Sequence, residues 1–248
     1  MGMTLQDGWT DEVIQMQTIP ITNILFMLVP VVIVAYFYYR WIDDAKEIAY
    51  ATLRMVAQLL LIGYILSYIF ASNSLLLVIF IVIFMVSVSS LIALRNFKNK
   101  SLRSYGDLFS AIAIGGTFNL TIVIVFVLDL QQFYKAEIVI PLAGMIYANA
   151  MNAVALSAER FENEIVHNTY ESARKSALRA SMIPQVNALL AVGLVSLPGM
   201  MTGQILSGVD PLIAVRYQIV VMAMVLGSSG ISTIIFLQLQ RDLQNKTL

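Results

Sequence analysis

The sequence has little charge and no cysteine, and both features narrow the classes of protein it can encode. Only 12% of its 248 residues are charged and 59% are hydrophobic, whereas soluble domains carry roughly 25% charged residues. A water-soluble surface cannot be built from this composition. Without cysteine, disulfide bonds and thiolate metal sites are excluded. The formal net charge is zero, so charge gives no indication of a nucleic-acid partner and we expect none.

The sequence also lacks the groups that would energise transport. The phosphate-binding loop G-x-x-x-x-G-K-[ST] is absent, and no polar stretch is long enough for an ATPase domain. Every Asp and Glu lies at or beyond the end of an apolar run, and the single histidine, His167, lies in a polar segment. Secondary transporters usually keep carboxylates or histidines inside the membrane. These absences favour an energy source on a separate subunit, while Na⁺ coupling through carbonyl and hydroxyl groups stays open.

The sequence does contain a series of apolar runs, each long enough to cross a bilayer. A helix of about twenty apolar residues spans the hydrocarbon core, and continuously apolar segments do not fit the alternation of a membrane β-barrel. We therefore predict an all-α polytopic membrane helix bundle of about seven transmembrane helices, forming a single domain over residues 1–248. The predicted spans are 21–39, 51–70, 75–94, 108–128, 138–158, 183–201 and 212–237.

The placement of Lys and Arg predicts the orientation of this bundle. Seven spans force the connecting segments to alternate sides, and one side then receives thirteen of the fifteen basic residues. The other side keeps only Lys135 and Arg216. Because cytoplasmic loops are enriched in Lys and Arg, we expect the N-terminus outside and the C-terminus in the cytoplasm. The sequence thus predicts a multi-pass protein of the plasma membrane, the inner membrane in a bacterium.

Polar side chains within the spans are the candidates for a translocation pathway. Arg54 and Gln58 are four residues apart and share one face of a helix, and lipid exposure would be costly for both. An alternative for Arg54 is an arginine that reaches the lipid headgroups. For the other amides, an interhelical hydrogen bond is at least as good an interpretation as contact with substrate. These amides are Asn119, Asn149, Asn152, Gln185 and Asn187.

Small residues and methionines predict packing in the bundle. Gly115, Gly116 and the run Gly227–Gly230 indicate close approach of helices; a hinge at 227–230 is the alternative. Methionines such as Met201 and Met222 allow either a thioether path for a soft metal ion or ordinary core packing. We favour packing in both cases.

The segment 159–182 is too polar for lipid and too regular for an irregular loop. Asn168 followed by Glu171 resembles a capping box at the start of a helix. Ala173 and Ala177 then give that helix an apolar edge. We predict two short cytoplasmic helices, which act either as a docking element for a cytoplasmic partner or only as a solvated connector.

Three stretches, taken together, match a known family. They are residues 53–64 (LRMVAQLLLIGY), residues 141–160 (from PLAGM to ER) and residues 196–222 (SLPGMMTGQIL, then DP and RYQIVVM). In these stretches the chain resembles the FetB-like ABC transporter permeases, which include bacterial proteins linked to iron export and plant relatives linked to aluminium tolerance.

The resemblance implies that transport and ATP hydrolysis are carried out by different chains. It implies a homodimer of permease chains with two copies of a separate ABC ATP-binding subunit, which binds ATP and Mg. This chain would then carry no cofactor and would not be an enzyme. The segment 159–182 also resembles a degenerate ABC coupling motif, in which a Glu is followed six residues later by Gly. Here Glu162 is followed by Asn168, and Asn also tolerates a left-handed backbone. The implied ATPase-coupling residues are Glu159, Arg160, Glu162, Asn168 and Glu171.

The substrate implied by the resemblance is iron or another metal. A bare Fe²⁺ favours imidazole or carboxylate ligands, and the middles of the predicted spans contain neither. Either the metal passes as a chelate or weakly held by amides and hydroxyls, or the substrate differs, and we assign no metal ligands. The main alternative function is an ion-coupled secondary transporter or a facilitator of a small polar solute. A third is a membrane scaffold that does not transport.

Overall fold

The structure, a computed structural model, describes residues 19–71, 74–98, 100–130 and 134–247. These residues are almost entirely helical and divide into two units, residues 1–69 and 70–248. Within the described part of the chain, six helical stretches are long and apolar enough to cross a membrane. They are residues 22–42, 46–70, 75–94, 102–127, 136–164 and 211–241. The predicted all-α polytopic membrane fold is confirmed, whereas its orientation and its division into domains stay predictions.

The first unit is a helical hairpin. Its first arm comprises α1 (Ile21–Ile24), η1 (Leu25–Met27) and α2 (Leu28–Ile42), and its second arm is α3 (Ala45–Ala71). Asp43 ends α2 in the left-handed conformation, with a φ of 63°. The side chain of Asp44 then accepts hydrogen bonds from the first N–H groups of α3. The Tyr38 hydroxyl donates to the Glu47 carboxylate across the turn.

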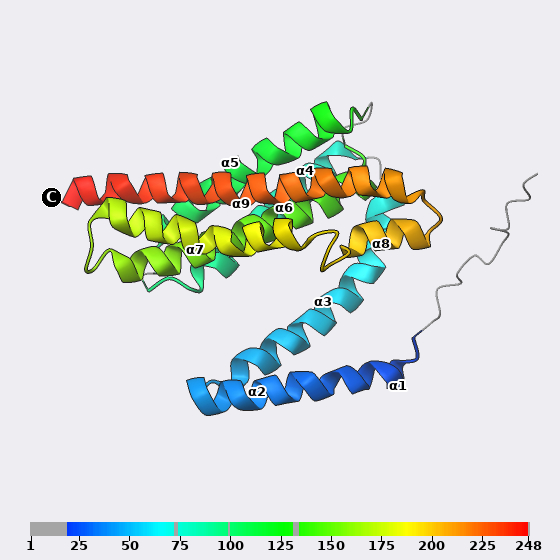
Figure 1. Ribbon diagram of the computed structural model, residues 1–248, viewed down its shortest axis with the longest axis horizontal. Coiled ribbons are helices and arrows are strands. Elements are labelled where there is room, and N and C mark those ends of the chain that lie inside the picture. Colours follow the sequence, from blue (N-terminus) through cyan, green and yellow to red (C-terminus); the bar gives the residue numbers. More distant parts are fainter. Residues whose placement is uncertain (1–18, 72–73, 99, 131–133, 248) are drawn as a thin grey trace, which may run out of the picture. The chain divides into compact units, whose positions relative to one another are not determined.

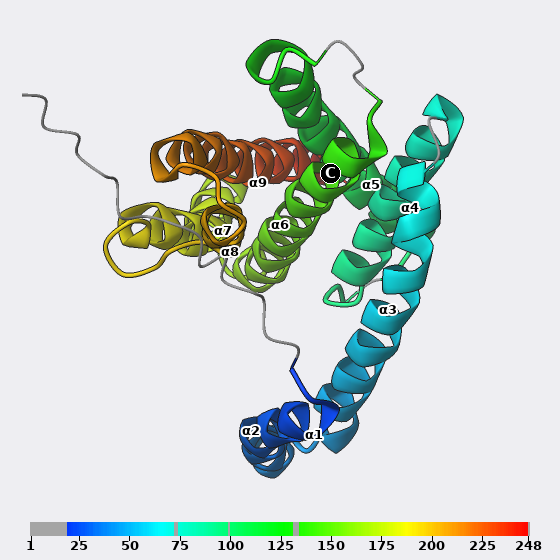
Figure 2. The same ribbon diagram turned by 90° about the vertical axis from the view of Figure 1, so that its right-hand side faces the viewer.

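The second unit is a bundle in which α6 and α9 each pack against four other α-helices. Helix α6 packs against α4, α5, α7 and α9, and α9 packs against α5, α6, α7 and α8 (Figure 2). Helix α5 ends in a short π-helical segment, η2. The bounds are α4 (Leu75–Leu94), α5 (Leu102–Thr121), η2 (Ile122–Val127), α6 (Ala136–Glu164), α7 (Tyr170–Ala191), α8 (Gly199–Leu206) and α9 (Pro211–Thr247).

Glycines allow α5 and α9 to run antiparallel in close contact. A Cβ added to Gly115 would lie 2.7 Å from the backbone nitrogen of Ser232, and one added to Gly227 would meet the Asn119 side chain. One end of this α5–α9 seam is marked by a 3.4 Å hydrogen bond from Gln240 to Asp107. The predicted packing role of the small residues is confirmed, because α9 continues through residues 227–230 as one helix.

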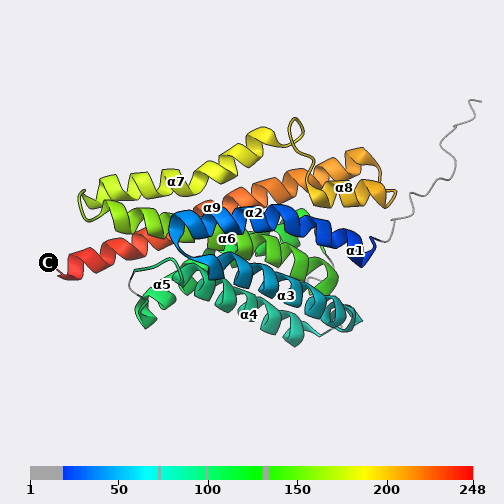
Figure 3. The ribbon, with the colours of Figure 1, turned by 90° about the horizontal axis from the view of Figure 1, so that it is seen from below.

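The predicted continuous span 183–201 is wrong. Helix α7 ends at Ala191, Gly193 adopts a φ of +81°, and a new helix, α8, starts at Gly199. The Ala191 carbonyl accepts hydrogen bonds from the N–H groups of residues 194, 195 and 196, which closes a tight turn. Figures 1 and 3 show α7 and α8 following one another along α9. The chain therefore passes along the bundle here in two helices, because the turn at 192–198 interrupts the apolar run.

The predicted pair of short helices within 159–182 is also wrong. Residues 159–164 are the end of the long helix α6, and residues 170–182 are the start of α7, so only the turn 165–169 separates two long helices. The capping residue is Thr169 rather than Asn168, since the Thr169 hydroxyl accepts from the N–H of Ser172 at 3.4 Å. Buried Phe161, Ala173 and Ala177 continue the apolar faces of both helices into this polar stretch.

The α5–α9 seam predicts a strong difference between two glycines of the same helix. Gly115→Ala should lower the free energy of unfolding by about 1–3 kcal/mol, because the added methyl group collides with backbone that cannot rotate away. Gly106→Ala is the matched control: no atom lies within 4 Å of its Cβ position, so the better helix propensity of alanine should leave stability unchanged or raised. Thermal unfolding in detergent measures both, and equal stability of the two variants would contradict the close packing.

Candidate functional site

The turn between α6 and α7 forms one end of the bundle, which we call the hairpin end (residues 159–176). It is tied to two other elements of the second unit. The backbone N–H of Lys98, in the α4–α5 loop, donates to the Glu162 carboxylate at 3.1 Å, and the Lys98 ammonium donates to Asn163 at 2.9 Å. The Tyr170 hydroxyl donates to the carbonyl of Leu237 in α9 at 2.6 Å. The two helices of the hairpin are therefore held to the rest of the bundle at their junction.

The two helices are also tied to each other. The Arg160 guanidinium forms an ion pair with Glu164 at 2.7 Å and donates to the Ser176 hydroxyl at 3.0 Å. The ring of Phe161 meets the ring of Tyr170 edge to face, with centroids 5.9 Å apart. These contacts join the last turn of α6 to the first turns of α7, so the hairpin end is a single packed piece.

All five residues implied as ATPase-coupling positions lie in this hairpin end, in two environments. Four of them are held by neighbours: Glu159 by Asn163, Arg160 by Glu164, Glu162 by Lys98, and Asn168 by Glu164. Glu171 instead lies exposed in the first turn of α7. Beside it the tip of the turn presents Val166, which is 68% exposed. Their contact with an ATPase stays a prediction.

The predicted pathway residues do not all share one site. Arg54 and Gln58 lie exposed on α3, in the first unit. In the second unit, Asn119 is buried in the α5–α9 seam, where its amide donates to the Gly115 carbonyl at 2.8 Å. This hydrogen bond lies within α5 and is not the interhelical bond that we weighed against substrate contact, so the role of Asn119 stays a prediction.

The remaining predicted amides lie on α6 and α7. Asn149 is half-buried and donates to the Met145 carbonyl of its own helix at 2.8 Å. Gln185 is buried, whereas Asn152 and Asn187 are exposed. Their role in transport stays a prediction.

The structure places in the bundle a set of polar atoms that the sequence analysis missed. Among the described residues, six buried side-chain oxygens have no hydrogen-bond partner. They belong to Ser157, Gln204, Gln218, Ser229, Ser232 and Thr233. An unpaired polar atom is costly away from water. Gln204 and Gln218 also line pockets, so these two positions have room for water or a ligand.

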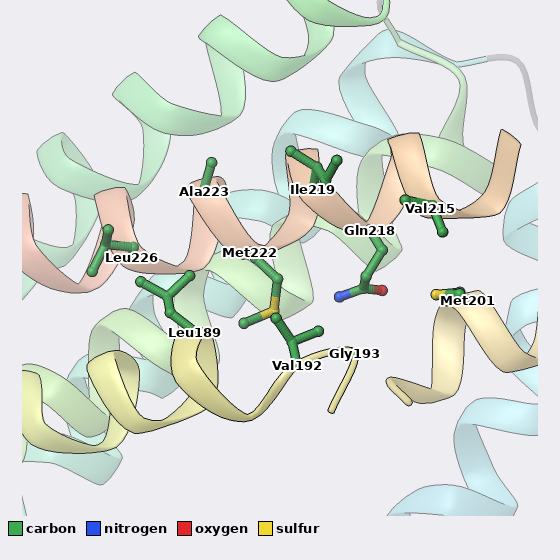
Figure 4. A pocket seen from close by; sticks show the side chains of 10 residues that line it. All are labelled: Leu189, Val192, Gly193, Met201, Val215, Gln218, Ile219, Met222, Ala223 and Leu226. Carbon is green, nitrogen blue, oxygen red and sulfur yellow. The ribbon is translucent and has the colours of Figure 1, made fainter. Parts of the chain in front are cut away.

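Gln218 lines a groove beside the break between α7 and α8. The groove has a volume of about 490 Å³ and is formed by α9, the end of α7 and the start of α8. Figure 4 shows the Gln218 amide pointing into it, and this side chain is only 5% exposed. Met201 and Met222 also line the groove, and the remaining lining is aliphatic. The sequence signal was an amide within the predicted span 212–237.

The groove has a neutral donor set. It offers one amide and two thioethers, and thioethers suit soft ions rather than a bare Fe²⁺. Elsewhere in the described part of the chain, no cluster of three or more His, Cys, Asp or Glu side chains is placed to hold a metal ion. The groove therefore suits a ligand that is mostly apolar and brings its own hydrogen-bond donor to Gln218.

The anchored hairpin end gives a testable stability prediction. Tyr170→Phe removes the hydroxyl that binds the Leu237 carbonyl, a net loss of about 1 kcal/mol. Amide hydrogen exchange by local opening of residues 165–171 should then be about fivefold faster. Tyr105→Phe is the control, since that hydroxyl makes no hydrogen bond within the described residues. If both variants exchange like the parent protein, the anchor does not hold the turn.

Comparison with known proteins identifies the family. The family model of UPF0014, an uncharacterised protein family, matches residues 21–243. A UPF0014 membrane protein of Synechocystis sp. is 32% identical over 81% of this chain and 84% of its own length. The Escherichia coli protein named "Probable iron export permease protein FetB" is 33% identical over 77% of this chain and 78% of its own length.

A plant protein is similar to the same degree. "Protein ALUMINUM SENSITIVE 3" of Arabidopsis thaliana is 32% identical over 76% of this chain and 73% of its own length. No solved structure matches the chain. Both the family model and the identity to these relatives extend over most of the sequence. The chain is therefore a multi-pass membrane protein that belongs to the UPF0014 family.

Proposed function

We propose that this chain is the permease subunit of an ABC transporter, which exports iron or another metal and is powered by a separate ATP-binding subunit. The observation that carries the proposal is the hairpin end. Two long helices, α6 and α7, meet there in a five-residue turn. A hydrogen bond from Arg160 to Ser176 joins the two helices, and one from Tyr170 to Leu237 joins α7 to α9. Support for the export of iron comes from the name of the E. coli relative.

The hairpin end suits the transmission of force from a soluble partner. A displacement of the turn must move α6 and α7 together, because Arg160 joins both helices. It must also move α9, because Tyr170 holds Leu237. Closure of a pair of ATPase subunits would then reach the spans as a rigid-body rearrangement. In this scheme two permease chains pair with two ATPase chains, ATP and Mg bind to the partner, and the hairpin end faces the cytoplasm.

The metal-binding side chains available in the bundle indicate whether the metal is transported as a free ion or as a chelate. In the described residues no cluster of carboxylates or imidazoles is available to strip the hydration shell from a divalent ion. The groove beside Gln218 is apolar and neutral instead. The proposal is therefore that the metal passes as a chelate whose organic ligand contacts the groove.

Two carboxylates, Glu137 in the first turn of α6 and Glu171 in the first turn of α7, provide a matched test of ATPase docking. Glu171 and Glu137 are both exposed and both lie in the first turn of a helix, so Lys substitution should alter stability equally. Glu171→Lys should lower binding of the ATP-binding subunit and ATP-driven transport by about tenfold or more, because charge reversal at a complementary interface costs several kcal/mol. Glu137→Lys should leave both unchanged.

The measurement uses the permease purified with its native partners and reconstituted in liposomes. ATP hydrolysis and efflux of radioactive iron, supplied as free ion or as chelate, are followed with and without ATP. Transport that persists after ATP depletion and follows an ion gradient would instead establish a secondary transporter. If neither Lys substitution changes binding of the ATP-binding subunit, the hairpin end is not its docking site.

A further inference from the structure

A cleft of about 630 Å³ opens between α6 and α7 at the hairpin end. Three basic residues line it: Arg160 from α6, and Lys175 and Arg179 from α7. Ser172 and Ser176 add hydroxyl groups, and these two lie on the same face of α7 as Lys175 and Arg179. The cleft is thus rich in hydrogen-bond donors.

The positive charge in this cleft is only partly neutralised. Arg160 is paired with Glu164 at 2.7 Å, and the one acidic residue of the lining, Glu159, accepts a hydrogen bond from Asn163. Lys175 and Arg179 form no ion pair or hydrogen bond with the described residues. A guanidinium, an ammonium and neighbouring hydroxyls are the donor set that binds phosphate oxygens.

The lining changes from polar to apolar along α7. Ser172 lies next to the turn, whereas Ile183 lies at the other end of the cleft, opposite Leu156 of α6. Ile183 is 52% exposed and Leu156 is 37% exposed. Eleven residues separate Ser172 from Ile183, or about 16 Å of helix. A ligand that fills this length therefore needs an anionic group at one end and an apolar group at the other.

We propose that the cleft binds an anionic phospholipid, with its phosphate held by Lys175, Arg179 and the serine hydroxyls and its acyl chain lying against Leu156 and Ile183. An inorganic phosphate would use only the polar half of the cleft. A lipid bound here bridges α6 and α7 within the hairpin end, so it stiffens the junction. The proposal concerns a site on this chain alone and does not depend on which protein docks at the turn.

The test is titration of the purified full-length chain with dioleoyl phosphatidylglycerol, followed by native mass spectrometry, with phosphatidylcholine as the uncharged comparison. Lys175→Gln with Arg179→Gln should weaken phosphatidylglycerol binding about thirtyfold, since each basic side chain near anionic lipid contributes about 1 kcal/mol, or about fivefold. The matched control, Lys100→Gln with Arg241→Gln, removes the same charge at the same end of the bundle, outside the cleft. It should bind like the parent protein.

A further variant separates a lipid from a free anion. Ile183→Asn places an uncharged polar group where the acyl chain would lie, and should weaken phosphatidylglycerol binding while leaving binding of inorganic phosphate unchanged, because the charge of the cleft is the same. Equal affinity of the two Gln double variants for phosphatidylglycerol would overturn the proposal. It would mean that the lipid is attracted by the overall positive charge at this end of the bundle and not by the cleft. Phosphate binding as tight as lipid binding, with no effect of Ile183→Asn, would assign the cleft to a soluble phosphate compound.

Discussion

The close contact between α5 and α9 is the constraint on which the rest of the second unit depends. In a bilayer, apolar side chains gain little by leaving lipid for protein, so helices associate where their backbones can pack closely. Gly115 against Ser232 and Gly227 against Asn119 provide that approach. Because α9 is fixed in this way, it can serve as the common support for α6, α7 and α8, all of which pack on it. The hairpin end and the groove are built on that support.

A single helix connects the two regions to which we assign function. Gln218, at the groove, and Leu237, which anchors the hairpin end, are both residues of α9, and nineteen residues of helix place them about 28 Å apart. Between them lie the buried hydroxyl groups of Ser229, Ser232 and Thr233, which lack hydrogen-bond partners in the described structure. The groove and the hairpin end therefore do not share side chains, and any coupling between them must be carried by displacement of helices.

Sequence predicted the features that depend on composition and spacing, and failed where tertiary contacts decide. Apolar length was enough to predict the spans, and Gly115 and Gly227 correctly indicated close packing. The run 183–201 is mostly apolar, so its length concealed the turn at Gly193 that breaks it. Polarity made 159–182 resemble a connector, although buried Phe161 and Ala177 continue two long helices. An isolated amide carries no sign of its partner: Asn119 donates to a carbonyl of its own helix, whereas the Gln218 side-chain oxygen has no hydrogen-bond partner among the described residues.

The break after Ala191 makes α6 and α7, the two helices that meet at the hairpin end, mechanically unequal. Helix α6 runs from Glu164 to Ala136 as one helix, and its single proline, Pro141, which removes a backbone hydrogen bond, lies only near the far end. Helix α7 stops at Ala191, and the turn at 192–198 can absorb rotation before it reaches α8. In the proposed function, a displacement of the turn at 165–169 would thus reach the far end of the bundle directly along α6. Along α7 it would have to pass through the turn at 192–198 before it reached α8.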